Sequence, residues 1–211
     1  MPITTYAELL TAVENWLVQF DVSTESDTFV DLAEDDIQNR IASYQMEEVE
    51  SGTFGSDTLA KPAGFLSVEA FYLDSPTRSR TFDYVPPDRF FETPERSWSG
   101  LPRIYTVIGD DFRIAPTPTG YDYILHYRKK LTALSDANPS NWVLADHPTL
   151  YLYGALSHAA EYLQMYDVGE RWRNRFDAKL MEVNKLEQRK YRPGGQMRSS
   201  SFQSRYEGRR Y

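Results

Sequence analysis

The sequence has no cysteine and only three histidines among its 211 residues. The lack of cysteine excludes a disulfide framework, a cysteine-ligated zinc site, an iron–sulfur cluster and thiol catalysis. Because His126, His147 and His158 are too few for a histidine-rich metal site, we expect no metal and no cofactor. No apolar run approaches the roughly 18–20 residues that a membrane span requires, so we expect no membrane contact.

The motifs of common active sites are missing as well. The sequence contains no glycine-rich phosphate loop, no GxSxG elbow and no HExxH motif. Adjacent carboxylates occur at positions 35–36, 47–48 and 110–111. A two-metal hydrolase requires carboxylates that converge from separate elements, whereas neighbours on one element are typical of a solvated helix face or turn. We therefore predict no enzymatic activity, and a hydrolase using these pairs is the less favoured alternative.

Length and composition are those of an ordinary globular protein. At roughly 100–200 residues per domain, the chain corresponds to one domain or slightly more. Hydrophobic residues make up 41% and charged residues 26%, which leaves enough apolar material for a core. The first residues, 1–6, lack the basic and apolar regions of a signal peptide. We expect the protein to be cytosolic where it is made.

Charge is distributed unevenly along the chain. Residues 1–60 carry 13 acidic groups and one basic group, a net charge of -12, and residues 61–170 carry a net charge of -4. Residues 171–211 carry 4 acidic and 12 basic groups, a net charge of +8, so that the whole chain has a net charge of -8. Such a chain can associate head to tail with itself or place its basic end on another acidic surface. A solvated acidic face with a loose basic tail remains an equal alternative.

Helical periodicity marks both ends of the chain. Thr5 and Glu8 fit a capping box, and apolar residues at steps of three and four continue to Phe20. A second helix is predicted over residues 28–44. Its apolar stripe consists of Phe29, Leu32, Ala33, Ile37, Ile41 and Tyr44. From Asp146 onward, an almost uniformly apolar segment at 150–156 predicts a central buried helix, and a last helix ends before Pro193.

The middle of the chain has the pattern of short strands. Ten of the 12 prolines lie between Pro62 and Pro148, which makes long helices unfavourable there. Alternating segments at 82–84, 104–108, 112–115 and 121–127 predict half-buried antiparallel strands. Residues 109–111 predict one hairpin turn and residues 74–79 another. Residues 86–91 predict one short helical turn.

The last twenty residues differ from the rest because they contain almost no aliphatic side chains. Such a segment cannot bury enough apolar surface alone to offset the entropy of ordering it, so we expect it to take shape on a partner. Its candidate binding residues are Arg192, Arg198, Phe202, Arg205, Tyr206, Arg209, Arg210 and Tyr211. Arginine with aromatic residues suits phosphate contact and base stacking, and it equally suits insertion into a protein groove.

Three of the four tryptophans, Trp16, Trp142 and Trp172, are interpreted as core anchors within helical patterns. Trp98 lies instead in a Ser- and Gly-flanked loop, and it is the tryptophan that we expect to contact a partner. These patterns together predict an α+β fold in which two N-terminal and two C-terminal helices form a bundle. The predicted segments are 1–46 for the N-terminal helices, 47–134 for an antiparallel β-rich insertion, 135–191 for the C-terminal helices and 192–211 for an extended tail.

The order of these elements resembles that of the head-to-tail adaptor, or connector, proteins of tailed bacteriophages. The resemblance is carried by several stretches in the same order rather than by one sharp motif, and it spans about residues 5–190. These stretches are YAELLTAVENWL at 6–17, FVDLAE at 29–34, LAKPAGFL at 59–66, PRIYTVIG at 102–109, FRIAP at 112–116, LSDANPSNW at 134–142 and HPTLYLYG at 147–154.

The resemblance implies a structural virion protein that forms a homo-oligomeric, dodecameric ring beneath the portal vertex. It implies a position in the neck between head and tail, with assembly in the host cytoplasm. The helices would form the ring, the β-rich part with Trp98 would face a tail or nozzle protein, and the C-terminal tail would bind the portal protein. Packaged DNA would pass through the lumen without sequence-specific binding. The alternative is a DNA-end-binding accessory module that acts through the basic tail.

Overall fold

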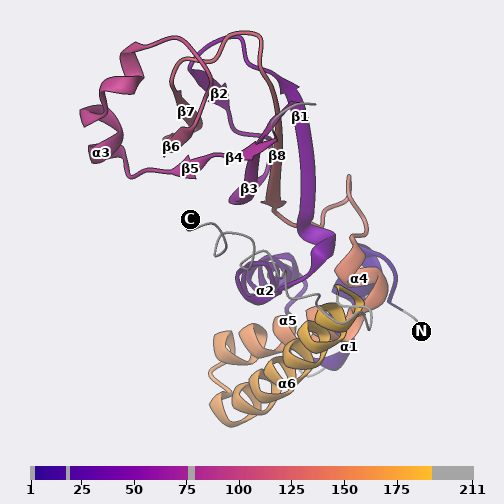
Figure 1. Ribbon diagram of the computed structural model, residues 1–211. Helices are drawn as coiled ribbons and strands as arrows, with labels where there is room; N and C mark the ends of the chain where they lie inside the picture. Colours follow the sequence, from indigo (N-terminus) through magenta and orange to yellow (C-terminus); the bar gives the residue numbers. More distant parts are fainter. Residues whose placement is uncertain (1–2, 18–19, 76–78, 192–211) are drawn as a thin grey trace, which may run out of the picture.

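The helices α1, α2, α4, α5 and α6 lie at one end of the molecule, and the strands lie at the other end together with the short helix α3 (Figure 1). The computed structural model describes residues 3–17, 20–75 and 79–191, and its helices and two β-sheets confirm the predicted α+β class. The predicted tail at 192–211, with all eight of its candidate binding residues, lies outside these described residues. Within the described residues, no helix is long and apolar enough to cross a membrane.

The helical part is built from the two ends of the chain. It contains α1 (Tyr6–Trp16), α2 (Ser26–Arg40), α4 (Trp142–Asp146), α5 (Pro148–Tyr162) and α6 (Tyr166–Tyr191). The predicted capping box is present at the start of α1, where the Thr5 hydroxyl accepts a hydrogen bond from the Glu8 N–H and the Glu8 carboxylate accepts one from the Thr5 N–H. These two bonds satisfy backbone donors that the first helical turn leaves free.

The second helix ends at Arg40, so the prediction that it extends to Tyr44 is wrong. Beyond Arg40, the side chain of Asn184 on α6 binds the backbone on both sides of Ile41. Its amide nitrogen donates to the Arg40 carbonyl at 3.1 Å, and its amide oxygen accepts from the Ala42 N–H at 2.9 Å. The Asn184 side chain thus supplies hydrogen-bond partners that a further turn of α2 would otherwise supply to the backbone. The chain can therefore leave the helix, and it adopts an extended conformation at Ile41.

Four apolar side chains of the two predicted helical stripes are exposed instead of buried, among them Phe20 at 40% and Tyr44 at 42%. Leu32 is 44% exposed on α2, and Trp16 is half exposed at the end of α1. Trp16 makes an edge-to-face contact with Trp172, at 5.2 Å between ring centroids. The interpretation of Trp16 as a core anchor is therefore wrong, since about half of this residue is exposed.

Helix α5 is the centre of the helical part, as its apolar sequence predicts, and it is buried on nearly all sides. It packs against α1, α2 and α6. Gly154 lies where α5 packs tightly against α2 and α6, because a Cβ atom added there would lie 2.8 Å from the Ala33 Cβ on α2 and 3.2 Å from the Phe176 ring on α6. The absence of a side chain at Gly154 thus sets the distance between these helices.

The β-rich part contains two four-stranded sheets. One sheet has the order β1 (Glu47–Thr53), β8 (Asp122–Lys129), β3 (Phe65–Asp74), β4 (Arg80–Thr81), and the other has the order β2 (Thr58–Ala60), β7 (Asp111–Ala115), β6 (Ile104–Ile108), β5 (Asp83–Tyr84). The prediction of purely antiparallel pairing is wrong for β5 and β6, which are parallel. The connection between them contains α3 (Pro87–Glu92) and the turn η2 (Pro94–Ser97), and this length lets the chain return in the same direction.

The two sheets share an aromatic core. Its fully buried members come from both sheets and from the segments between them, namely Phe54, Phe71, Phe82 and Phe112. The predicted alternation on β8 is present, with Tyr123, Leu125 and Tyr127 buried. The predicted turn at 109–111 joins β6 to β7 as an antiparallel hairpin, and Gly109 has a φ of 57°, which favours glycine.

We predict that Gly154→Ala lowers the free energy of unfolding by about 1–3 kcal/mol, because the added methyl group overlaps Ala33 unless the helices separate. Urea unfolding followed by circular dichroism measures this change. Gly55→Ala is the matched control, since no atom lies within 4 Å of the added Cβ. Equal stability of the two variants would contradict the close packing at Gly154.

Candidate functional site

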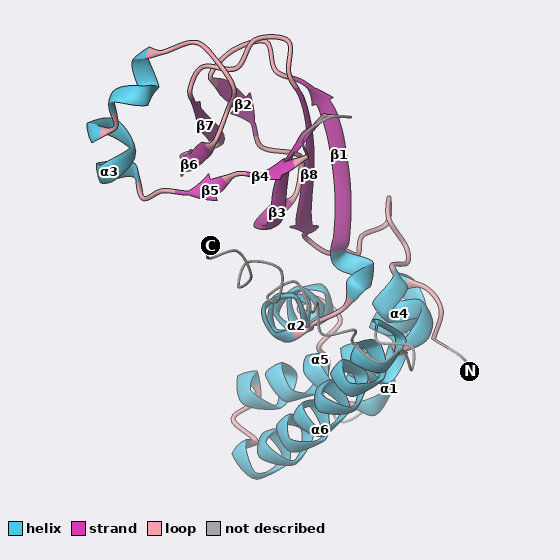
Figure 2. Ribbon diagram, in the orientation of Figure 1, coloured by secondary structure: helices cyan, strands magenta, loops and turns pink. Residues whose placement is uncertain are grey.

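The polypeptide crosses between the helical part and the β-rich part twice, and these crossings determine how the two ends of the molecule are held. Figure 2 shows that β1 follows the helical part through a short helical turn and that a loop leads from β8 into α4. The first crossing is residues 41–46, which include η1 (Tyr44–Met46). The second crossing is residues 130–141.

The first crossing is held by a buried glutamate from α6. Glu187 is 1% exposed, and its carboxylate accepts hydrogen bonds from the Ser43 hydroxyl at 2.5 Å and from the Gln45 side chain at 3.5 Å. Its other oxygen pairs with Lys190 at 2.8 Å. Burial alone would raise the pKa of Glu187, but the hydrogen bonds from Lys190, Ser43 and Gln45 outweigh it and lower the pKa below its ordinary value.

The second crossing is held by a buried glutamate from α2. Glu34 is 8% exposed, and its carboxylate accepts a hydrogen bond from the Leu134 N–H at 3.1 Å. Burial raises the pKa of Glu34 to about 7, and the neighbouring charges of Asp31 and Asp35 act in the same direction. The bond from Leu134 opposes this shift without cancelling it. Unlike Glu187, Glu34 therefore changes its charge near neutral pH.

A cleft of about 330 Å³ lies beside the first crossing, where α6 meets the start of β1. Its lining includes Glu47, Glu69, Arg128 and Glu187. The Arg128 guanidinium donates to the Ile41 carbonyl at 2.9 Å, so it binds the crossing itself. Among the described residues, no group of three or more histidine and carboxylate side chains is arranged to hold a metal ion. Arg128 on β8 and Glu187 on α6 both bind the first crossing.

The adjacent carboxylates that the sequence contains do not converge. They lie on α2, on β1 and in the β6–β7 hairpin. Asp36 pairs with Arg173 at 2.9 Å and with His158 at 3.1 Å, which ties α2 to α6 and α5. Glu47 contacts His126 at 3.0 Å, and Glu48 pairs with Lys129 at 2.9 Å. Each of these contacts joins neighbouring elements of the fold.

Trp98 lies in an exposed loop directly after the turn η2. Trp98 is 59% exposed. Its backbone is fixed by two hydrogen bonds, because the Trp98 carbonyl accepts from the Thr117 N–H at 2.8 Å and the Trp98 N–H donates to the Glu95 carbonyl at 3.1 Å. Phe91 in the preceding helix is 51% exposed, with the Arg96 guanidinium 5.1 Å from the centre of its ring. A held backbone with uncovered rings is typical of a contact surface.

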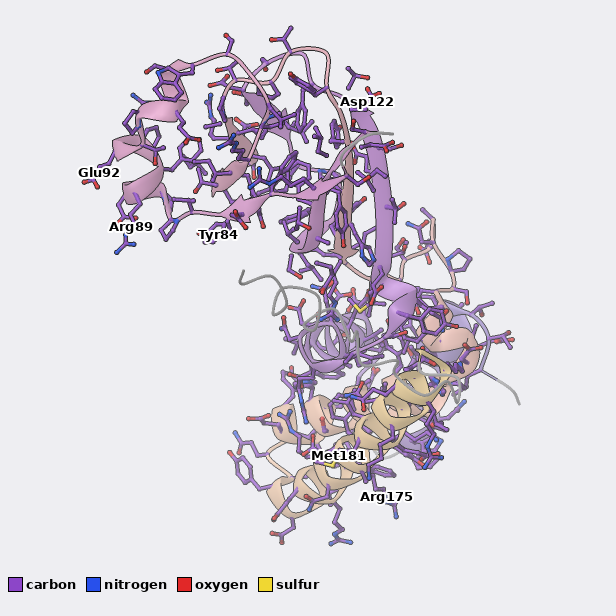
Figure 3. The ribbon with its side chains drawn as sticks, in the orientation of Figure 1. Tyr84, Arg89, Glu92, Asp122, Arg175 and Met181 are labelled. Atoms are coloured by element: carbon purple, nitrogen blue, oxygen red, sulfur yellow. The ribbon has the colours of Figure 1, made fainter. Side chains whose placement is uncertain are left out.

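Tyr84 on β5 is a third exposed aromatic residue of this segment. Figure 3 labels Tyr84, Arg89 and Glu92 along the side of the β-rich part that carries α3. We call Tyr84, Phe91 and Trp98 the aromatic end. Of these three residues, the sequence pattern predicted only Trp98 as a contact. The exposure of one ring could also have been predicted at Phe90-Phe91, since a single helical turn buries only one of two consecutive side chains. Phe90 is the buried residue of this pair.

The contacts described so far join helices, sheets and chain crossings to one another. A family model matches residues 4–200, and its description is SU10 adaptor protein. The chain belongs to this family of phage head-to-tail adaptor proteins, which confirms the resemblance. It is accordingly a structural protein of the phage virion. A comparison with curated proteins gives no match.

We predict that Glu34→Gln stabilises the protein above neutral pH. Because the pKa of Glu34 is about 7 in the folded protein against 4.5 for the ordinary group, its stabilising contribution is complete below pH 4.5 and is lost as the pH rises through 7. Glutamine keeps an acceptor for the Leu134 N–H but carries no charge. At pH 8 the variant should therefore exceed the wild type by about 2–3 kcal/mol in free energy of unfolding.

Urea unfolding at pH 5 and at pH 8 measures this difference, which should largely disappear at the lower pH. Glu92→Gln is the control, because this carboxylate is exposed on α3 and does not contribute to the pKa shift of Glu34. A constant difference between Glu34→Gln and the wild type at the two pH values would contradict the raised pKa of Glu34.

Proposed function

We propose that this protein is a head-to-tail adaptor that forms a ring between the portal vertex and the tail, in the neck of the virion. The observation that carries the proposal is the family match over residues 4–200. The family implies interaction with phage portal and tail proteins. A molecule that contacts two partners needs two separate surfaces, and the described residues offer a helical end and an aromatic end that are held apart by two chain crossings.

The helical end, with the C-terminal segment 192–211, is the proposed portal-binding side. The segment continues directly from α6, which ends at Tyr191. It contains five arginines and a single acidic residue, Glu207. Arginine and aromatic side chains are favoured anchors in protein grooves, and a segment that folds on its partner covers a large surface for its length. We assign the eight tail residues named from the sequence to this contact.

The aromatic end is the proposed tail-side surface. Tyr84, Phe91 and Trp98 expose rings that could be buried against a tail or nozzle protein. In the assembled virion, a dodecameric ring would leave a lumen for the packaged DNA. The net charge of -8 supports passage without adhesion, because an acidic body repels phosphate groups.

We predict that replacing Arg192, Arg198, Arg205, Arg209 and Arg210 by glutamine abolishes binding to purified portal rings while the helical content is retained. The reason is the loss of the charge-assisted bonds that guanidinium groups form with carboxylates. Binding is measured by co-sedimentation with the portal. Replacement of the same five residues by lysine preserves charge and is the matched control. Normal portal binding by the glutamine variant would rule out the tail assignment.

We predict that Trp98→Ala weakens binding to the tail-side protein by about 30-fold or more, since an anchoring tryptophan at an interface contributes about 2 kcal/mol or more. Folding stability should hardly change, because the side chain is exposed. Surface plasmon resonance with the purified tail-side protein measures the affinity. Tyr72→Ala, which removes another exposed aromatic residue from β3, is the control. Equal affinities for the two variants would exclude Trp98 from the contact.

A further inference from the structure

One face of α6 carries a line of exposed residues that has no partner element. Its members follow one another at steps of three and four and are Arg171, Arg175, Ala178, Glu182, Lys185 and Arg189. This spacing places them on a single side of the helix over about 27 Å. Met181, beside this line, is 61% exposed. Figure 3 labels Arg175 and Met181 on α6, in the part of the molecule remote from the sheets. We call this line the basic face.

The cations of the basic face have no ion-pair partner in the described part of the chain. Arg171, Arg175, Lys185 and Arg189 form no ion pair with any described residue. The cations elsewhere on α6 are paired: Arg173 with Asp36, Lys179 with Glu182 and Lys190 with Glu187. Arg175 instead lies over the Trp172 ring, 4.7 Å from its centre. Unneutralised positive charge is thus concentrated on the one side of α6 that points into solvent.

Helix α2 carries the opposite pattern. Asp27, Asp31 and Asp35 are exposed at steps of four, and none of them forms an ion pair with a described residue. Burial raises the pKa of Asp31, and the charges of Asp27 and Asp35 raise it further, so the like charges repel one another. The exposed Leu32 lies next to them. We call Asp27, Asp31, Asp35 and Leu32 the acidic face.

The two faces point away from each other within one subunit. Helices α2 and α6 are linked directly by Asp36 with Arg173 and by Arg40 with Asp177. Asp36 and Arg40 lie about 140–180° around α2 from Asp31, and Arg173 and Asp177 lie correspondingly far from the basic face around α6, at 100° per residue. Because the linked sides face inward, the acidic and basic faces point outward in roughly opposite directions. Neither face can neutralise the other in the same subunit.

We infer that the basic face of one subunit docks on the acidic face of a second copy of this chain, head to tail. This inference rests on the proposed ring and names the helix faces that would build it. The occupant follows from charge complementarity: Arg171 and Arg175 are separated by the same four-residue step, about 6 Å along a helix, as Asp27, Asp31 and Asp35. Leu32 and Met181 add an apolar contact beside the charges. A head-to-tail contact of this kind closes into a ring when its rotation permits.

Two charge-reversed full-length chains test the contact. The first is Asp31→Arg with Asp35→Arg, which makes both faces basic, and the second is Arg171→Glu with Arg175→Glu, which makes both faces acidic. Each variant alone should lose self-association by roughly 10- to 100-fold relative to the wild type. An equimolar mixture should recover it, because every basic face then meets an acidic one. Native mass spectrometry at low salt should show oligomers larger than dimers that contain the two variants in equal numbers.

A charge reversal outside the two faces is the control, and a second reversal of the basic face repeats the test. Asp88→Arg with Glu92→Arg reverses two exposed carboxylates at the same spacing on α3 and should leave self-association unchanged. Lys185→Glu with Arg189→Glu provides an independent reversal of the basic face if the first one does not fold. Circular dichroism establishes folding in each case. Self-association of either folded single-face variant at the wild-type level, or no recovery in the mixture, would overturn the inference.

Two further results would also overturn the inference. The first leaves the proposed adaptor function intact, and the second assigns a different partner to the basic face. A wild-type chain that stays monomeric at low salt but still binds portal rings would refute the helix contact alone. Loss of binding to a duplex DNA by Arg171→Glu with Arg175→Glu, with self-association unchanged, would assign the basic face to nucleic acid. In that case DNA affinity should fall steeply with salt.

Discussion

The structure depends on two buried glutamates that bind the chain where it passes between helices and sheets. Glu187 binds Ser43 and Gln45 in the first crossing, and Glu34 binds the Leu134 N–H in the second. A buried carboxylate without partners is costly, so these bonds strongly favour one path of the chain. The position of the β-rich part relative to the helices follows from them, and with it the distance between the aromatic end and the helical end.

The two buried glutamates both bind a chain crossing, but their pKa values are shifted in opposite directions. Lys190 neutralises Glu187, and several donors keep its pKa low, so the first crossing is held by a stable charge. Glu34 has one backbone donor and lies beside the acidic residues of α2, so its pKa rises to about 7. The crowding of carboxylates on α2 thus affects both the interior, through Glu34, and the surface, through Asp31. Repulsion between the carboxylates of α2 destabilises the single subunit, and a positively charged surface of a neighbouring subunit would relieve this repulsion.

Much of the fold could be predicted from local patterns. The capping box at Thr5, the hairpin at 109–111, the short helix α3 and the buried side of β8 each depend on residues close together in sequence. The wrong predictions concern features that depend on residues distant in sequence. Asn184 ends α2 before Tyr44, and α3 and η2 let β5 pair in parallel with β6. Exposure of Trp16 and Leu32 follows from how the helices meet, which periodicity cannot show.

By itself, the sequence determined the α+β class, the lack of recognised catalytic motifs, the charge gradient and the suspicion that Trp98 meets a partner, because composition and short-range periodicity carry this information. Only the tertiary structure decided that Phe91 and Tyr84 are also exposed, that Glu34 and Glu187 bind the crossings, and that the uncompensated charges of α2 and α6 lie on outward faces. The binding of the crossings depends on contacts between residues 100 or more positions apart, namely Glu34 with Leu134 and Ser43 with Glu187, and no local pattern encodes such pairs.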